Sequence, residues 1–194
     1  MGRLKFVVAR YEKDNYDKFL GTTIGDFDIK NVTNEEANSI YSKYNVGVRY
    51  WEQNGLKDDD VVVFCHADVK LVDKDLEEKI LYAFDQNQHL GVAGVIGTKE
   101  LTEDGGWWLS DITNHRGHLL QWVDEEEKNK YHLSRGEGNH FDMCVVDGLC
   151  MFVKGHIAKN LKFDEAYYPN SYNFYDYDFC LSVLGCGYSI AYVS

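Results

Sequence analysis

The first chemical signal in the sequence is a pair of potential metal ligands directly after an apolar run. Residues 61–65 read VVVFC, and His66 and Asp68 follow them. In extended backbone, side chains two residues apart point the same way, so both would face one cleft. Carboxylate oxygen suits Mg²⁺ or Mn²⁺, and Mn²⁺ also accepts imidazole. The pair therefore predicts either a divalent metal site or a polar strand end that simply meets water.

A second cluster contains two carboxylates, Asp176 and Asp178, in the segment Tyr-Asp-Tyr-Asp at residues 175–178. At the start of a helix, carboxylates complement the positive end of the helix dipole, which is a purely structural role. Two side chains two positions apart do not share a helix face, so at least one points into the sheet or a cleft. A carboxylate in a cleft could act as a general base that deprotonates a hydroxyl group.

The first half of the sequence alternates strand and helix patterns. Thr33 and Glu36 form a capping box that predicts a helix start, and Gly55 is expected to cap its end. Asp73 is expected to cap a second helix. Short apolar runs predict strands at residues 4–9, 27–32, 61–65 and 90–96. This order predicts an α/β fold with a mainly parallel sheet, which binds ligands beyond the carboxyl ends of its strands.

The second half is less regular. A final helix over 174–184, capped by Gly187, and a last strand over 188–193 are clear, and the acidic segment 124–130 is expected to be a loop. Further short strands are predicted at residues 107–109, 118–123, 143–146 and 150–153.

Charge and cysteine content limit the class of protein. The 194 residues suit one domain, and the net charge of −12 argues against nucleic acid as a partner. An acidic protein that binds a phosphorylated ligand needs a bound cation to offset the repulsion. The sequence has no apolar run long enough to span a membrane and no signal peptide. The five cysteines show no CxxC spacing, which indicates free thiols and a cytoplasmic location.

Several segments resemble GT-A glycosyltransferases of the family 2 type. Those enzymes carry a helix with an Asn-x-Gly step, an apolar strand that ends in Asp-x-Asp, and then Phe-Asp-Glu, Glu-Asp-x-Asp and Gly-Tyr motifs. The matching segments are residues 39–48, 60–69, 147–153, 161–165, 175–181 and 187–188. Phe-Cys-His-x-Asp at 64–68 and Phe-Tyr-Asp-x-Asp at 174–178 are most similar to the StrF-type glycosyltransferase-like family. The resemblance covers nearly the whole chain.

This resemblance implies a GT-A (Rossmann-like) three-layer fold with a central, mainly parallel sheet. It implies a single domain, with a nucleotide-binding part at about residues 1–100 and an acceptor part at about 101–194. It implies that Asp68 binds Mn²⁺ or Mg²⁺. His66 occupies the position of the family's first Asp and is expected to contact the metal or the ribose. The residues that match the nucleotide site are Arg10, Tyr11, Glu12, Asn45 and His66.

On the acceptor side, the resemblance implies that Asp176 is the catalytic base and Asp178 its supporting carboxylate, with Tyr175 in place of the family's Glu. The implied acceptor or sugar contacts are Trp107, Trp108, Asp147 and Gly148. The implied reaction is an inverting transfer of a sugar from a nucleotide-sugar donor to a saccharide or other hydroxyl acceptor. Related enzymes carry a further metal-binding His beyond the last strand, which another copy in a homo-oligomer could supply.

Other functions fit some of these patterns. The same fold could serve as a non-catalytic module that binds a sugar or nucleotide sugar, since fold does not determine function. A sugar-phosphate nucleotidyltransferase would need a glycine-rich loop after the first strand, and residues 10–13 contain no glycine. A zinc site at Cys65 and His66 would need a second ligand pair, and no suitably spaced pair is evident.

Overall fold

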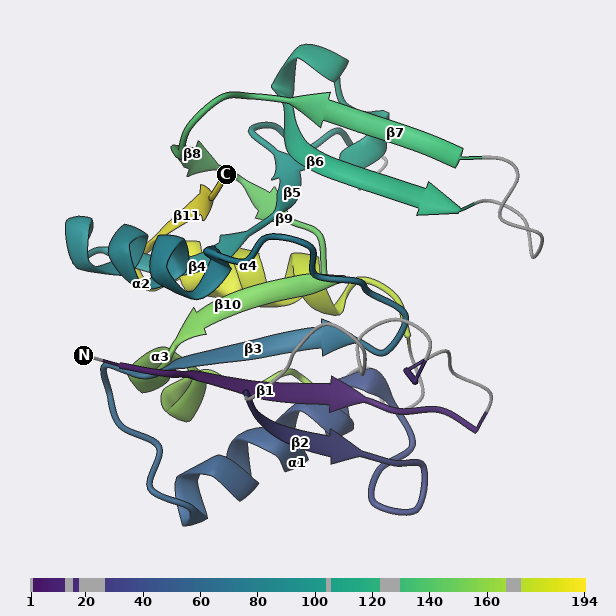
Figure 1. Cartoon of the computed structure of the whole chain (residues 1–194), viewed down its shortest axis with the longest axis vertical. Helices are drawn as coiled ribbons and strands as arrows, with labels where there is room; N and C mark the ends of the chain where they lie inside the picture. Colours follow the sequence, from purple (N-terminus) through teal and green to yellow (C-terminus); the bar gives the residue numbers. More distant parts are fainter. Residues whose placement is uncertain (1, 13–15, 18–26, 104–105, 123–129, 167–171) are drawn as a thin grey trace.

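The framework of the protein is a mainly parallel sheet. The computed structural model describes residues 2–12, 16–17, 27–103, 106–122, 130–166 and 172–194. These residues form a seven-stranded sheet in the order β2-β1-β3-β10-β4-β11-β8 (Figure 1). Its strands are Leu4–Ala9 (β1), Asp28–Val32 (β2), Val61–His66 (β3), Leu90–Gly94 (β4), His140–Met143 (β8), Cys150–Lys154 (β10) and Ser189–Tyr192 (β11). Only β10 and β8 run antiparallel to their neighbours in this sheet.

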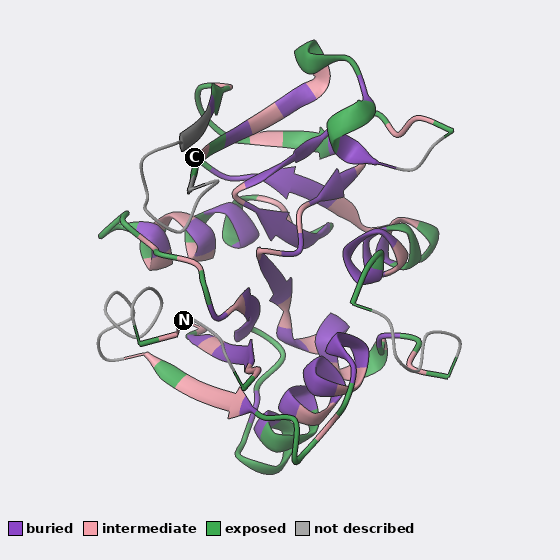
Figure 2. Cartoon of the chain, turned by 90° about the vertical axis from the view of Figure 1, so that its right-hand side faces the viewer, coloured by how far each residue is buried: buried purple, intermediate pink, exposed green. Residues whose placement is uncertain are grey.

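Helices cover both faces of this sheet. Helices α1 (Ile40–Gln53), α3 (Gly155–Asn160) and α4 (Tyr175–Gly185) pack on one face, and α2 (Leu76–Gln86) packs on the other. Side chains along each strand alternate between the two faces. Val7 of β1 lies in the core beneath α1, α3 and α4, whereas Phe6 and Val8 lie in the core beneath α2. Figure 2 shows the buried strands between these layers. The three-layer, mainly parallel Rossmann-like fold of the GT-A type is confirmed.

A smaller antiparallel sheet lies at one end of the large one, in the order β7-β6-β5-β9. Its strands are Ile96–Thr98 (β5), His115–Trp122 (β6), Lys130–Arg135 (β7) and Val145–Val146 (β9). Two short 3₁₀ helices, η2 (Trp107–Leu109) and η3 (Ile112–Asn114), connect β5 to β6. Because β4 and β5 belong to different sheets, the single strand predicted over 90–96 is divided at Val95.

The start of the first helix differs from the prediction. Helix α1 begins at Ile40, and its capping box consists of Ser39 and Ser42 rather than Thr33 and Glu36. The Thr33 backbone N–H does donate to the Glu36 carboxylate (3.0 Å), but that segment forms only a turn. The end is as predicted: Gly55 adopts the left-handed conformation (φ 83°) directly after the C-cap. A local hydrogen-bond pattern can close a turn as well as open a helix.

Two further local predictions are wrong. Asp75, not Asp73, is the N-cap of α2, and the Asp73 carboxylate instead accepts the Asp75 backbone N–H (2.9 Å). Residues Trp107–Leu109 form the 3₁₀ helix η2 rather than a strand, because the Trp107 side chain and backbone are held by contacts distant in sequence. Residue 123 of the predicted 118–123 strand and residues 124–129 of the predicted loop lie outside the described residues. The final helix, the left-handed Gly187 (φ 84°) and the last strand are confirmed.

Strands from both halves of the chain share the large sheet. β10 lies between β3 and β4, and β11 pairs with β4, so residues of the second half complete the sheet that the first half begins. The division into a nucleotide-binding part at 1–100 and an acceptor part at 101–194 stays a prediction.

We expect Ser39→Ala to lower the free energy of unfolding by about 1 kcal/mol, because it removes the hydroxyl that accepts the Ser42 backbone N–H (3.1 Å) at the start of α1. The control is Thr33→Ala, which should cost less than about 0.5 kcal/mol, since Thr33 is exposed and starts no helix. Urea denaturation measures both. Equal losses in the two variants would contradict the assignment of the cap.

Candidate functional site

The carboxyl ends of the parallel strands β1 and β3 form one border of the candidate site. His66 is the last residue of β3 and lies opposite Ala9, the last residue of β1. Asp68 follows two residues later and is exposed. Burial raises the pKa of the Tyr11 hydroxyl, and the nearby Tyr172 hydroxyl and Asp68 carboxylate raise it further. The loop after β1 and the loop after β3 therefore meet at this edge, as expected for an open α/β sheet.

The Tyr11 ring is held from two sides. The Lys43 ammonium lies over it, 4.3 Å from the ring centroid, and the Tyr172 ring contacts it edge-on at 5.5 Å. Lys43 is itself buried and donates from Nζ to the Arg10 carbonyl (2.8 Å) and to the Asn34 side chain. This buried lysine therefore fixes both the loop after β1 and the ring of Tyr11.

His66 connects the strand end to helix α4. Its Nε2 forms a 2.5 Å hydrogen bond with the Tyr175 hydroxyl. Burial lowers the pKa of His66, although the negative charges of Asp68 and Asp147 act in the opposite direction. The imidazole is therefore neutral near pH 7, and only its Nδ1 is left for a ligand.

Asp176 is the buried carboxylate of the site, in the first turn of α4. Its Oδ2 accepts the Gly148 backbone N–H (3.0 Å), and its Oδ1 accepts the Tyr177 backbone N–H (3.0 Å). Burial raises the pKa of Asp176 to about 7, and the charge of Asp147 adds to this. The backbone hydrogen bonds to its carboxylate act in the opposite direction and lower the pKa. Close to neutral pH, this carboxylate can therefore accept a proton as readily as release one.

Asp147 is positioned by the turn between β9 and β10. Its Oδ1 accepts the Leu149 backbone N–H (2.9 Å), and its Oδ2 accepts the indole N–H of Trp107 (2.8 Å). Between Asp147 and Leu149, Gly148 has no alternative side chain, because a Cβ there would lie 2.0 Å from the Tyr175 hydroxyl. The turn thus brings a carboxylate and a backbone donor to the start of α4.

The structure brings together many of the residues that sequence reasoning proposed. Interactions from Tyr11 through Asp68, His66 and Asp147 to Asp176 connect the ends of β1 and β3, the turn after β9 and the start of α4. Gly148 and Trp107 belong to the same network.

Some proposed residues lie elsewhere or have a structural contact. The Asn45 amide is buried and bonds both backbone groups of Phe163, donating to its carbonyl (2.9 Å) and accepting from its N–H (3.0 Å). Trp107 is buried, whereas Trp108 is 60% exposed. Arg10 packs its guanidinium on the Tyr16 ring at 4.1 Å, and Glu12 is exposed. The amide of Asn45 and the ring of Trp107 thus support the structure, and a ligand cannot stack on Trp107 without displacing its neighbours.

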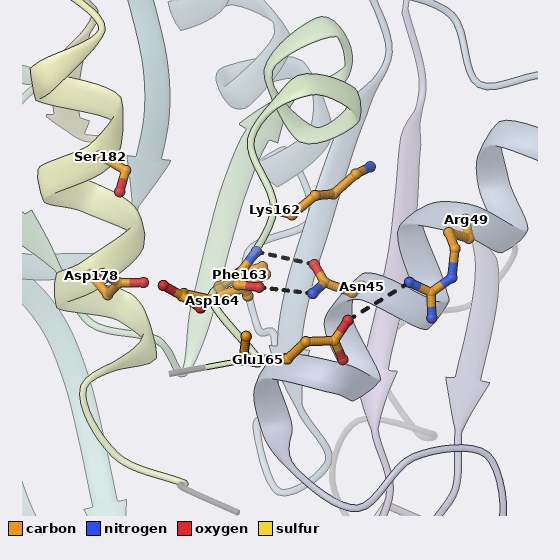
Figure 3. A pocket seen from close by; sticks show the side chains of 9 residues that line it. Asn45, Arg49, Lys162, Phe163, Asp164, Glu165, Asp178 and Ser182 are labelled. Carbon is orange, nitrogen blue, oxygen red and sulfur yellow. Dashed lines mark hydrogen bonds and ion pairs between the residues drawn. The ribbon is translucent and has the colours of Figure 1, made fainter. Parts of the chain in front are cut away.

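Asp178 faces a different space from Asp176. A pocket of about 450 Å³ lies between α1, α4 and residues 161–166, and Asp178 and Asp164 point toward each other in it (Figure 3). Burial raises the pKa of Asp178, and the negative charge of Asp164 adds to this. Arg49 and Glu165 form an ion pair on another wall (4.0 Å). The two carboxylates of the Tyr-Asp-Tyr-Asp segment thus interact with different charged groups.

Comparison with known families identifies the chain. Residues 22–193 match the model of a glycosyltransferase-like family. The chain belongs to this family. Its fold is similar to that of the crystal structure of A197 from STIV, with a TM-score of 0.58 at 10% sequence identity, covering 100% of this chain and 82% of that one. At this identity the likeness concerns the fold alone, and no curated protein matches the chain. Family membership supports a glycosyltransferase-type function.

The metal-binding side chains available in this glycosyltransferase-like protein suit a cation that is also coordinated by the phosphate oxygens of a ligand. Among the described residues, no three or more His, Cys, Asp or Glu side chains group closely enough to hold a metal ion. Mg²⁺ often takes only one or two carboxylates and completes its coordination with phosphate oxygens and water. The exposed Asp68 fits that pattern. His66 fits less well, because its Nε2 is bonded to Tyr175.

Sequence reasoning missed three residues that build the site of this family member. It assigned no role to Lys43, Tyr172 or Tyr177, although Lys43 lies among the mostly apolar buried residues of α1, and that position was an available signal. The Tyr177 hydroxyl accepts the Trp107 backbone N–H, a contact across 70 residues that no local pattern predicts.

None of the helices in the described part of the chain combines the length and apolarity needed to cross a membrane.

We expect Asp176→Asn to stabilise the protein more at pH 8 than at pH 5, relative to wild type. The folded-state pKa of about 7 exceeds the ordinary Asp value, so the folded protein holds a proton that the unfolded chain releases. Wild type therefore loses stability as the pH rises from about 4 to about 7, and the variant does not. Urea denaturation at both pH values should show the difference changing by roughly 1–3 kcal/mol in favour of the variant. A difference that is independent of pH would contradict the burial argument.

Proposed function

We propose that the protein is a metal-dependent, inverting glycosyltransferase of the StrF-type branch. It moves a sugar from a nucleotide-sugar donor to a saccharide or other hydroxyl acceptor. The observation that carries the proposal is the buried Asp176 carboxylate, whose pKa of about 7 suits a general base at the edge of the sheet where Asp68 also lies. The match of residues 22–193 to a glycosyltransferase-like family supports this reading.

Asp176 acts on the acceptor in this proposal. The backbone N–H groups of Gly148 and Tyr177 fix the orientation of its carboxylate, and each oxygen keeps a second lone pair for a proton. The acceptor oxygen forms a bond to the anomeric carbon while its proton passes to Asp176. The bond from that carbon to the nucleoside diphosphate breaks on the opposite side, and the configuration inverts.

The donor lies over the loops that follow β1 and β3. The Tyr11 ring, held by Lys43 and Tyr172, is the proposed platform for the nucleotide base. Asp68 is the proposed ligand of a divalent cation. When bound, Mn²⁺ or Mg²⁺ would neutralise the diphosphate and act as a Lewis acid on the leaving group. A chain with a net charge of −12 has few other means of offsetting a diphosphate.

Donor binding can be tested by thermal shift with UDP-, GDP-, CMP- and dTDP-sugars, each with and without Mn²⁺. At a ligand concentration a hundredfold above Kd, binding should stabilise the protein by about 2.7 kcal/mol. We expect at least one nucleotide to raise Tm by roughly 5 °C or more with Mn²⁺ only, and Asp68→Ala to abolish the shift. The matched control is Asp85→Asn, an exposed carboxylate on α2, which should respond like wild type. Binding without metal would contradict the role of Asp68.

Catalysis is tested separately with Asp176→Asn. Loss of the general base should lower kcat at least about 100-fold, while the donor-induced thermal shift remains. In wild type, kcat/KM should rise with pH through about 7, because only the deprotonated carboxylate accepts a proton. Transfer at the wild-type rate by this variant would refute the assignment of the base. Donor binding with neither transfer nor donor hydrolysis in wild type would instead favour a non-catalytic nucleotide-sugar binding module.

A further inference from the structure

Phe174, the residue before α4, has a strained backbone. It is the one non-glycine residue with positive φ in the described part of the chain (φ 63°, ψ 5°). For a bulky side chain this left-handed conformation costs roughly 1–2 kcal/mol, whereas glycine adopts it freely and asparagine with less cost. Such strain persists only where surrounding contacts impose it, and it is concentrated at functional sites.

Hydrogen bonds on both sides of Phe174 impose the conformation. The Tyr172 hydroxyl donates to the Asn38 carbonyl (2.6 Å), and the Tyr41 hydroxyl donates to the Asn173 carbonyl (2.9 Å). On the other side, the Phe174 carbonyl accepts the Asp178 backbone N–H (2.9 Å) within the first turn of α4. The chain must therefore turn sharply at position 174, between the Tyr11 side of the site and Asp176.

These contacts explain the turn but not the side chain. Phe174 is 52% exposed, so burial in the core does not account for an aromatic ring at this position. The ring contacts Tyr177 edge-on, with the centroids 5.9 Å apart. A glycine would satisfy the same backbone bonds at lower cost, which indicates that the ring itself has a use.

A second exposed ring belongs to the same network. Tyr177, whose ring contacts Phe174, also accepts the Trp107 backbone N–H through its hydroxyl. The centroid of the Trp108 ring lies 6.0 Å from that of Trp107. Trp108 is 60% exposed, whereas Trp107 is buried and bonded to Asp147. Phe174 and Trp108 are thus two largely exposed rings that are linked through the Tyr177–Trp107 contact, and Phe174 precedes Asp176 by two residues.

We propose that Phe174 and Trp108 form an aromatic subsite for the acceptor, and that the acceptor is a pyranose sugar. A pyranose ring presents C–H groups on its faces, which pack on aromatic rings, and hydroxyl groups around its edge. An acyclic polyol, a lipid alcohol or a protein hydroxyl lacks such a planar apolar face. This inference rests on the proposed function, because it assigns the class of compound that Asp176 deprotonates.

The subsite is tested by saturation-transfer NMR with methyl pyranosides of glucose, galactose, mannose, rhamnose and N-acetylglucosamine. Sorbitol, an acyclic polyol, is the comparison ligand, and UDP with Mn²⁺ is present throughout. At least one methyl pyranoside should bind wild type, with saturation strongest on its ring C–H protons, and sorbitol should bind at least tenfold more weakly. Equal binding of sorbitol, or binding of no methyl pyranoside, would overturn the proposal.

Variants separate the rings from the fold. Phe174→Gly and Trp108→Ala should each weaken binding of that methyl pyranoside at least tenfold. Phe174→Gly should not lower Tm, because glycine relieves the left-handed strain. The matched control is Tyr82→Ala, which removes a 57% exposed ring on α2 and should bind like wild type. Binding within twofold of wild type in Phe174→Gly and Trp108→Ala would overturn the proposal.

The same variants distinguish failure of this inference from failure of the proposed function. A nucleotide- and Mn²⁺-dependent thermal shift in wild type and in all three variants would support the donor site. It would do so even if the pyranoside result rejects the acceptor subsite. Absence of any nucleotide-dependent shift in wild type rejects the proposed function. The pyranoside titration still decides the aromatic subsite in that case, since it measures binding directly.

Discussion

The burial of Asp176 beside Asp147 is the constraint on which the site depends. Two carboxylates from distant segments lie within each other's field at the start of α4, and burial alone already disfavours the charged form of Asp176. Hydrogen-bond donors offset this cost. Asp176 accepts the backbone N–H groups of Gly148 and Tyr177. Asp147 accepts the backbone N–H of Leu149 and the indole N–H of Trp107. The turn between β9 and β10 supplies two of these four donors, Gly148 and Leu149, so its conformation matters to the site.

Tyrosine hydroxyl groups hold the surrounding segments in place. Tyr175 bonds His66, Tyr177 bonds the backbone of Trp107, and Tyr41 bonds the backbone of Asn173. Burial raises the pKa of Tyr175, so its hydroxyl stays protonated. These bonds tie α4 to the end of β3 and to η2, and they tie α1 to the segment before α4, without using charged groups. In a strongly acidic protein, such neutral ties position carboxylates without adding further negative charge to the site.

The sequence predicted the framework well and the side-chain contacts less well. The apolar runs that became β1, β3 and β10 are buried on both faces, so their pattern leaves few alternatives to a strand in a covered sheet. The capping box at Thr33 was wrong by six residues, because Ser39 and Ser42 offer an equivalent local bond closer to the packed face of α1. Trp107 was expected to contact sugar, yet its indole N–H is bonded to Asp147, 40 residues away. Asn45 is bonded in the same way to Phe163, 118 residues away.

The amino-acid sequence by itself determined the alternation of strands and helices in the first half of the chain, the edge of the sheet where the candidate site lies, and the residue types available there. Periodicity and capping act over a few residues, so these features can be recognised locally. Only the tertiary structure decided which carboxylate is buried, since Asp176 and Asp178 each follow a tyrosine and precede an aromatic residue. Packing of α4 turns Asp176 toward Asp147 and leaves Asp178 beside Asp164. The pKa values of the two residues depend on those distant neighbours, because desolvation and charge act through space and not along the chain.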